Sequence, residues 1–424
     1  MTDDLETILR LYSKKHTNKA LNFFWIGFLI YSASFALSTT TTVSYILCQV
    51  LQIVGILIFV PSAIKLIEWK FTNTYLKTLF AIYCMWQLSV VFRGLDLDYS
   101  KIKVLLFDAE TGLFRFFVPL VLLFPKNLLY YKKIVITILL LGVLFIVYDI
   151  LFYDNLTNLD YENVDTKFTY EHFVKILSVS SGLVLMTFPY QTKRTKIIVL
   201  IVLIVSVFFS ILRARRALLI MTLSPLMISY ILLLYTQKKK NLLIFFSVLF
   251  GIFIVLFSYN EYNVKTPAIF KLLSDRATSD TRSGVEDSFY RDMETQDWII
   301  GKGINGRYFS PGLDVGTSTN YRYMIETDYL NIILKGGIIS LALMLLIAIP
   351  AIIMGLFYSK NILSKAAAIW ILLWVIELYP ANVSTFSMHH ILLWISIGIC
   401  YSKVIKGIPE ATLQKIFSQS IDER

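Results

Sequence analysis

Three arginines stand close together in a short turn between two apolar stretches of this chain: Arg213, Arg215 and Arg216. Arginine is permanently charged and presents a planar fork of N–H donors, which suits bidentate binding of phosphate. The apolar stretches on both sides are long enough to cross a membrane. Arginines at the mouth of a membrane helix therefore suggest a site for an anionic ligand.

A second candidate anion site lies in the long polar segment 259–329. Arg282 directly precedes Ser283-Gly-Val-Glu286, which has the form of a helix capping box. Apolar residues then recur at four-residue spacing, at Val285, Phe289 and Met293. We predict a helix from about Gly284 to Trp298, with Arg282 and the free N–H groups of its first turn forming a phosphate site. The alternative is a surface arginine that pairs with a neighbouring aspartate.

Two carboxylates, Glu326 and Asp328, close this segment at the start of the next apolar stretch. A carboxylate there can stabilise the positive end of the helix dipole. Alternatively, beside converging arginines, one of the two can act as a general base. Further residues of the segment are candidates for the same site, Arg291 and Arg322 for phosphate and Tyr308, Tyr321, Tyr323 and Tyr329 for sugar rings. Interfacial tyrosines are the commoner explanation of such aromatics.

Three other residues fall inside or at the end of apolar stretches and are candidates to line a cavity: Arg115, His389 and His390. A charge inside a membrane segment is costly and normally faces a cavity or a partner. Glu110 is the nearest partner in the sequence for Arg115.

Two motifs have a more ordinary explanation. Gly301-Lys-Gly-Ile-Asn-Gly306 matches the dinucleotide fingerprint, but no strand–turn–helix unit surrounds it, so we predict a tight glycine turn. Asp96-Leu-Asp98 resembles a metal-binding pair, yet Arg93 and Lys101 beside it favour a solvated acidic loop. We therefore expect no metal and no cofactor.

These residues are positioned by twelve apolar stretches, each about long enough to cross a bilayer core of about 30 Å. The stretches are 21–39, 44–64, 75–92, 111–125, 134–153, 171–190, 195–212, 217–235, 241–258, 330–357, 365–379 and 387–402. Every second connection is rich in lysine, which places these connections and both termini in the cytoplasm. We expect an all-α, polytopic membrane protein of about twelve spans in the bacterial inner membrane, with its site facing outward.

The predicted organisation has five parts. They are a cytoplasmic segment 1–20, nine helices in 21–258, a large outer loop 259–329, three helices in 330–402, and a cytoplasmic tail 403–424.

Composition excludes several classes of protein. A hydrophobic fraction of 56% with a mean hydropathy of +0.66 does not suit an ordinary soluble domain. The net charge of +11 is mostly lysine in the cytoplasmic connections, so it does not indicate a nucleic-acid partner. The three cysteines lie within apolar stretches and are too few for a disulfide framework or a zinc site.

The chain resembles the O-antigen polymerase and ligase superfamily of envelope glycosyltransferases. The resemblance covers about 205–345 and rests on Ala214-Arg-Arg-Ala217, on Arg282 before an amphipathic helix, and on the turn at Gly301 and Gly303. Ligases carry His-Asn-x-Tyr-Leu at the place where this chain has Glu326-Thr-Asp-Tyr-Leu330. This difference favours a Wzy-type polymerase over a WaaL-like ligase.

The resemblance implies a GT-C-like membrane glycosyltransferase without a metal. Such an enzyme transfers a growing glycan from undecaprenyl diphosphate to an acceptor repeat unit, building O-antigen or capsule. It implies that Arg215 and Arg282 bind the diphosphate, while Glu326 deprotonates the acceptor with inversion. The partners would be undecaprenyl-diphosphate-linked oligosaccharides and the bilayer; the sequence neither requires nor excludes a chain-length regulator. An O-antigen ligase acting on lipid A core, and more distantly a flippase or transporter, are the alternatives.

Overall fold

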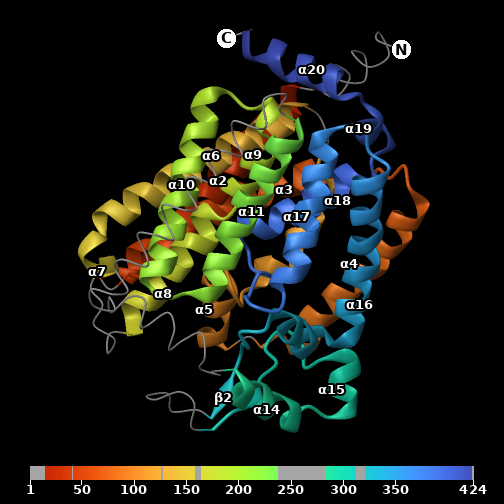
Figure 1. Ribbon diagram of the computed structural model, residues 1–424. Coiled ribbons are helices and arrows are strands. Elements are labelled where there is room, and N and C mark those ends of the chain that lie inside the picture. Colours follow the sequence, from red (N-terminus) through yellow and green to blue (C-terminus); the bar gives the residue numbers. More distant parts are fainter. Residues whose placement is uncertain are drawn as a thin grey trace, which may run out of the picture.

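The computed structural model describes residues 15–40, 42–96, 98–125, 128–157, 164–236, 282–311 and 320–422. The described chain is almost entirely helical (Figure 1). The longer helices are α2 (Lys15–Ser38), α3 (Tyr45–Leu66), α4 (Thr74–Gly94), α6 (Leu128–Leu151), α10 (Lys193–Leu212), α11 (Arg216–Thr236), α16 (Asp328–Phe357), α17 (Ile362–Glu377) and α18 (Met388–Tyr401). The shorter ones are α5 (Tyr99–Phe107), α7 (Tyr153–Thr157), α8 (Val164–Phe173), α9 (Ser181–Met186), α14 (Ser283–Asp292), α15 (Thr295–Ile300), α19 (Lys403–Gly407) and α20 (Glu410–Asp422). The predicted all-α class is confirmed.

Seven of the described helices are long and apolar enough to cross a membrane: α2, α3, α4, α6, α10, α11 and α16. Two shorter apolar helices, the 3-10 helix η1 (Leu113–Leu123) and α18, accompany them. The predicted stretch 241–258 lies outside the described residues. These helices make the chain compatible with a multi-pass membrane protein, while the total of twelve spans stays a prediction.

The apolar stretch 171–190 does not form the single helix predicted for it. The chain passes from α8 into the π-helix η2 (Val174–Ser178), then through α9 into the 3-10 helix η3 (Phe188–Tyr190). Lys175 and Glu171 are engaged in a buried ion pair here, and Pro189 removes one backbone donor. A π-turn of this kind often marks a functional position.

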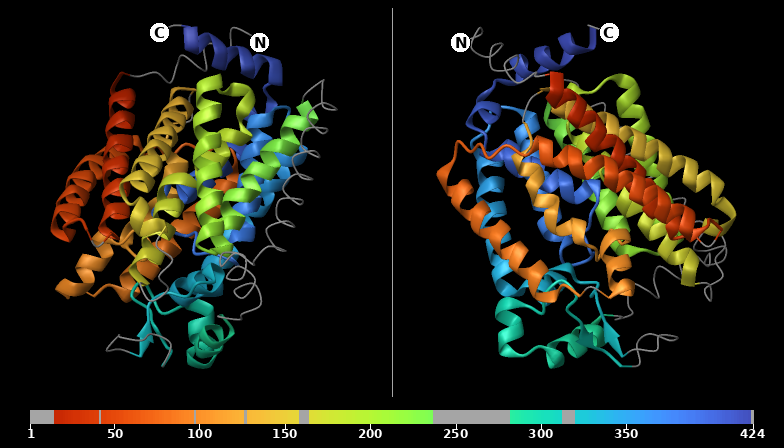
Figure 2. Two further views of the ribbon diagram at one scale, coloured as in Figure 1. Left: turned by 60° about the vertical axis from the view of Figure 1, so that its left-hand side comes forward. Right: turned by 180° about the vertical axis from the view of Figure 1, so that it is seen from behind.

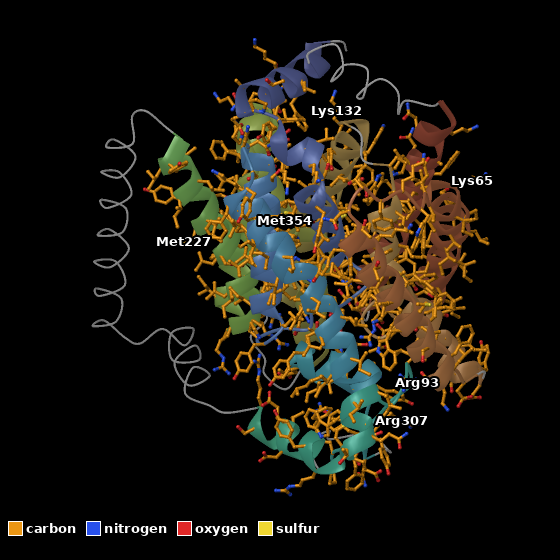
Figure 3. All side chains as sticks on the ribbon, turned by 90° about the vertical axis from the view of Figure 1, so that its right-hand side faces the viewer. Lys65, Arg93, Lys132, Met227, Arg307 and Met354 are labelled. Atoms are coloured by element: carbon orange, nitrogen blue, oxygen red, sulfur yellow. The ribbon has the colours of Figure 1, made fainter. Side chains whose placement is uncertain are left out.

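The connections lie at two opposite ends of the helical bundle. At one end, hydrogen bonds join Thr39 to Thr169 and Ala109 to Phe386; at the other, they join Glu68 to Leu123 and Lys360 to Lys406. Lys65 and Lys132 lie toward the second end, and Arg93 and Arg307 toward the first (Figure 3). Helices α14 and α15 are at the first end and α20 at the second (Figure 2). The lysine pattern predicts that the first end faces outward.

The described part of the predicted outer loop, residues 282–311 and 320–329, is called the outer segment below. It does not contain the predicted continuous helix from Gly284 to Trp298. Helix α14 ends at Asp292, Met293 is extended, and Glu294 begins α15 with a capping box to Asp297. The capping box predicted at Ser283 is not formed either: Arg282 occupies the N-cap position without a side-chain cap bond, and Glu286 accepts a hydrogen bond from Thr327. Helix α14 nevertheless begins at Ser283, next to the predicted start at Gly284, and a second helix start at Glu294 interrupts the predicted continuous helix.

The outer segment has a small core of its own, which it shares with α16. Phe289, Met293, Tyr308 and Ile325 pack with Leu330, Ile333 and Leu334. A short antiparallel hairpin of β1 (Tyr308–Phe309) and β2 (Tyr321–Arg322) covers it.

Helix α16 is broken at Gly337, whose φ of 69° is left-handed. The break leaves backbone carbonyls without helical partners, and the turn at Gly301–Gly306 supplies donors. The amide of Lys302 donates to Leu334 O (2.7 Å) and that of Gly303 to Lys335 O (2.9 Å). The glycine motif is thus a tight turn, as predicted, and it caps the break in α16.

Labelling from the two sides of the membrane will test the predicted orientation. In a protein without its native cysteines, a cysteine at Gln296 in α15 should react with an impermeant maleimide on intact cells. A cysteine at Lys415 in α20 should react only after permeabilisation. Reaction of both from outside would refute the orientation.

The break in α16 makes Gly337 irreplaceable. A Cβ there would lie 1.9 Å from Ile299 O, in addition to the roughly 1–2 kcal/mol cost of a left-handed residue. We expect Gly337→Ala to lower the thermal unfolding temperature in detergent strongly. Gly284→Ala, where no atom lies within 4 Å, should leave it nearly unchanged; equal behaviour of the two variants would contradict this account.

Candidate functional site

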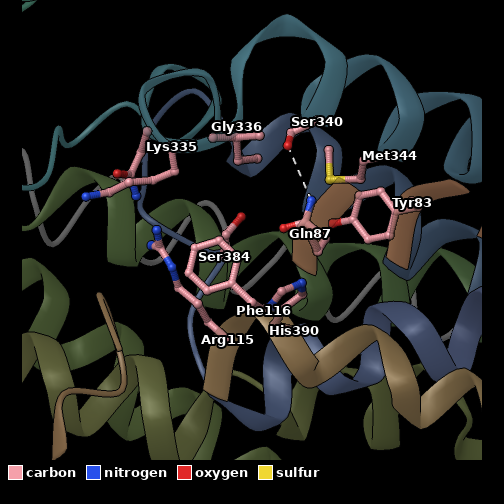
Figure 4. A pocket seen from close by; sticks show the side chains of 12 residues that line it. Tyr83, Gln87, Arg115, Phe116, Lys335, Gly336, Ser340, Met344, Ser384 and His390 are labelled. Atoms are coloured by element: carbon pink, nitrogen blue, oxygen red, sulfur yellow. Dashed lines mark hydrogen bonds between the residues drawn. The ribbon is translucent and has the colours of Figure 1, made fainter. Parts of the chain in front are cut away.

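A cavity opens among α4, η1, α16 and the connection before α18 (Figure 4). It lies toward the first end of the bundle, since Lys335 in its lining is hydrogen-bonded to Gly306 of the turn there. Its empty volume is about 450 Å³, part of it open to solvent. The lining includes Tyr83, Gln87, Arg115, Phe116, Asn331, Lys335, Ser340, Met344, Ser384 and His390. In Figure 4, Arg115 and Lys335 lie on one side, and Tyr83, Gln87 and Met344 on the other.

Arg115 is one of two cations in this cavity, and only 6% of its surface is exposed. Its Nη1 donates to the backbone carbonyl of Glu110 (2.9 Å), and its guanidinium lies 4.8 Å from the centre of the Phe116 ring. Glu110 is thus the partner expected from the sequence, although it contributes its carbonyl and not its carboxylate to this hydrogen bond. Arg115 also interacts electrostatically with Asp328 and Asp108.

Lys335 is the second cation, and it is 2% exposed. Its ammonium donates to Gly306 O (2.8 Å) and lies 5.9 Å from the centre of the Tyr323 ring. The helix break two residues later places Lys335 here, because the glycine turn that caps the break also supplies the acceptor. Two buried basic side chains that line one cavity favour an anionic ligand.

Asp328 holds the cavity wall together and is fully buried. Its Oδ2 accepts from the amides of Val383 (3.1 Å) and Ser384 (2.7 Å), and its Oδ1 accepts from the side chain of Asn331 (3.3 Å). These bonds tie the start of α16 to the connection before α18. The arrangement makes Asp328 a structural carboxylate.

The two histidines have different surroundings. Nδ1 of His390 faces Thr385 O (3.1 Å), which can only accept, and Nε2 faces the indole N–H of Trp394 (3.2 Å), which can only donate. His390 is therefore a neutral Nδ1–H tautomer with both nitrogens engaged. His389 does not line the cavity, and its Nε2 lies 2.9 Å from the Glu377 carboxylate in a buried pair.

A buried network of charges lies behind Arg115. Lys175 bridges Glu171 (2.7 Å) and Glu110 (3.5 Å), and His172 Nε2 lies 3.7 Å from Glu110. Burial by itself would raise the pKa of Glu110, but the charges of Lys175 and His172 lower that pKa far below its usual range. Glu110 thus stays ionised, and it connects the network to Arg115 through its carbonyl.

Arg215 joins the same network. Its Nη1 lies 3.3 Å from the Glu171 carboxylate, and the turn that carries it has a left-handed residue, Ala214, with φ 49°. Arg215 and Arg115 are therefore linked through Glu171, Lys175 and Glu110. Of the two neighbouring candidates, Arg213 is buried and Arg216 exposed.

Arg282 and Glu326 are brought together beside Tyr379 and Pro380, and neither is among the residues that line the cavity. Arg282 donates to Pro380 O (2.6 Å) and Tyr379 O (3.3 Å), and its Nε lies 3.7 Å from the Glu326 carboxylate. Glu326 is accessible, with 69% of its side chain exposed. Arg282 thus binds the start of the connection before α18, and Asp328 binds the same connection a few residues later, at Val383 and Ser384.

The remaining candidates differ in exposure, and of these Tyr323 lies close to the cavity, with its ring centre 5.9 Å from Lys335 Nζ. Tyr308 is fully buried in the core of the outer segment, so its ring presents no face to a sugar. Tyr321 and Tyr323 are exposed, Tyr329 and Arg322 are partly exposed, and Arg291 is exposed on α14. Among the residues that the structure describes, no three His, Cys, Asp or Glu side chains are grouped to hold a metal ion.

Sequence reasoning missed Lys335, Lys175 and Glu171. Each is a charged residue within or at the edge of a predicted span, which is the signal that drew attention to Arg115. Ser384 and Gln87 carried no such signal.

No family model, no curated protein and no solved structure matches this chain.

The buried charge network should contribute strongly to the thermal stability of the protein. Lys175→Met leaves two buried carboxylates without their shared cation, which typically costs about 3–5 kcal/mol. We expect a large drop in thermal stability in detergent, partly restored by adding Glu110→Gln.

The matched control is the exposed pair of Lys70 and Glu68, 2.7 Å apart. Lys70→Met should cost less than about 1 kcal/mol, because water screens such pairs. A Lys175 variant as stable as the Lys70 variant would show that the buried charge network does not stabilise the fold.

Proposed function

We propose that this protein is a Wzy-type polysaccharide polymerase. It would transfer a growing glycan from undecaprenyl diphosphate to an acceptor repeat unit, at the outer face of the bacterial inner membrane. The observation that carries the proposal is the cavity with its two buried cations, Arg115 and Lys335, at the end of the bundle that the lysine pattern predicts to face outward. The motifs shared with the superfamily, described above, support it further.

The cations suit the donor. A sugar diphosphate is already activated, so the protein must chiefly stabilise the charge that develops on the departing diphosphate. Preorganised cations in a cavity partly shielded from water do this effectively. Arg115 and Lys335 would bind the diphosphate. Arg215 would act through the charge network that it joins at Glu171, and Arg282 through the connection before α18 that it binds at Pro380. Arg213, Arg216, Arg291 and Arg322 would contribute at most to the surrounding field.

Glu326 is the base in this proposal. The acceptor hydroxyl gives its proton to Glu326, and its oxygen bonds to the anomeric carbon as the bond from that carbon to the diphosphate oxygen breaks. Undecaprenyl diphosphate leaves, and the anomeric centre inverts. Glu326 is accessible and beside Arg282, whereas Asp328 is buried and already accepts three hydrogen bonds. The two carboxylates predicted as catalytic thus separate into a base and a structural residue.

Sugar binding in this proposal falls to Tyr321, Tyr323 and Tyr329. The first two are exposed, and Tyr323 lies 4.8 Å from the guanidinium of Arg307. Twelve spans, a GT-C-like architecture and independence of metals complete the proposal. An O-antigen ligase would use the same donor site but take lipid A core as its acceptor.

Reconstitution tests the proposal. The protein in liposomes with lipid-linked repeat units should produce a ladder of longer glycans and release undecaprenyl diphosphate, also in the presence of EDTA. Glycan transfer to lipid A core without a ladder would favour the ligase. Neither product, with the donor lipid moved across the bilayer, would favour a flippase.

Replacing the proposed base sharpens the test. Glu326→Gln should slow transfer by roughly 10²–10⁴-fold, because it removes the basicity and leaves the shape. Protein stability should not change, since the side chain is exposed. Asp287→Asn, at an exposed carboxylate on α14, is the matched control and should transfer normally; a fully active Glu326 variant would remove the base from this mechanism.

A further inference from the structure

A second cavity lies between α4 and η1, and its chemistry is the opposite of the first. Its empty volume is about 400 Å³, part of it open to the surroundings. Its walls are Cys84, Leu88 and Val91 of α4 and Phe117, Pro119 and Leu120 of η1. None of these six side chains is charged, so a hydrocarbon is the chemistry that the cavity fits.

The two cavities share a wall. Gln87 and Phe116 line both the cationic cavity and the apolar one. The Gln87 side chain donates to Ser340 Oγ (3.3 Å) across the cationic cavity (Figure 4), and the Phe116 ring packs on Arg115. A ligand that filled both cavities would pass these two side chains.

The apolar cavity also borders the outer surface of the bundle. Leu88, which lines it, is 43% exposed, and the neighbouring Met85 is 63% exposed. Phe117 and Leu120 on the η1 side are half-buried. Since α4 has the length and composition of a membrane span, this surface faces bilayer hydrocarbon when the helix is inserted.

We infer that the hydrocarbon chain of a phosphate lipid leaves the cationic cavity through the α4–η1 cavity, passing Gln87 and Phe116 to reach the bilayer. The inference rests on the proposed function for the identity of the lipid, a polyprenyl phosphate. The charge arrangement supports it: the anionic head fits Arg115 and Lys335, and the chain fits the uncharged walls beside them. A soluble sugar phosphate would leave this second cavity unused.

Another apolar cavity, near Leu363 and Phe417 at the opposite end of the bundle, fits the same ligand less well. Its lining contains no charged side chain and it shares no wall with a cationic cavity. It has room for a hydrocarbon chain, but no basic side chain in its lining could bind a phosphate.

The test compares binding of a polyprenyl monophosphate with binding of inorganic diphosphate to the whole protein in nanodiscs. Leu88→Trp fills the apolar cavity and should weaken lipid binding about tenfold or more, because each displaced methylene costs affinity. It should leave inorganic diphosphate binding unchanged. Met85→Trp, three residues away and outside the lining, is the matched control and should leave both unchanged.

Unchanged lipid binding by a folded Leu88→Trp protein would overturn the inference. If that variant does not fold, the wild-type protein is photocrosslinked instead, with a polyprenyl phosphate that carries a photoreactive group in its first isoprene units. Crosslinks within 84–91 and 116–120 are expected, and crosslinks near Leu363 or Phe417 would refute the path. Because neither experiment requires glycan transfer, a wild-type protein that binds the lipid on this path but builds no glycan would refute the polymerase and leave the path standing.

Discussion

The site depends on one interruption, the break of α16 at Gly337. Inside a membrane each backbone carbonyl needs a donor, so a helix can break only where another segment supplies one. Here the amides of Lys302 and Gly303 do so, while Arg93 donates to the carbonyls of Ile300 (2.7 Å) and Gly301 (3.2 Å). The same turn therefore holds α16 and α4 together. These two helices and η1 form most of the walls around both cavities.

Charge balance is the second constraint. The two cavity cations are not neutralised at close range by a carboxylate oxygen in the described hydrogen bonds, because each donates to a backbone carbonyl. Carboxylates stand one step farther away: Glu110 in the network with Lys175, and Asp328 in the wall. This arrangement fixes both side chains in the cavity lining, and among the described residues no carboxylate is in direct hydrogen-bond contact with either. A carboxylate in direct contact would have filled the place of an anionic ligand.

The apolar runs and the lysine pattern were enough to predict the helical class and most helix positions, because both depend on local composition. The charge of Arg115 inside an apolar run also singled it out as a cavity candidate. The contact between Arg282 and Glu326 is seen only in the structure. The sequence pattern alone did not reveal Lys335 as a cavity residue. Its position follows from the break of α16 at Gly337, which the turn at Gly301–Gly306 makes possible. The pattern likewise could not predict that Tyr308 is buried or that the outer helix stops at Asp292. Those outcomes depend on which segments meet, and residue spacing does not determine that.

The core of the outer segment has a consequence for how this architecture can diversify. Phe289 and Tyr308 are buried against Leu330 and Leu334, which belong to α16. The segment is therefore not a module that recombination could exchange as a cassette between proteins of this architecture. A transplanted segment would meet a foreign α16 and lose half of its core. New binding specificities would have to arise by substitution at its exposed residues, or by transfer of the segment together with the helix that follows it.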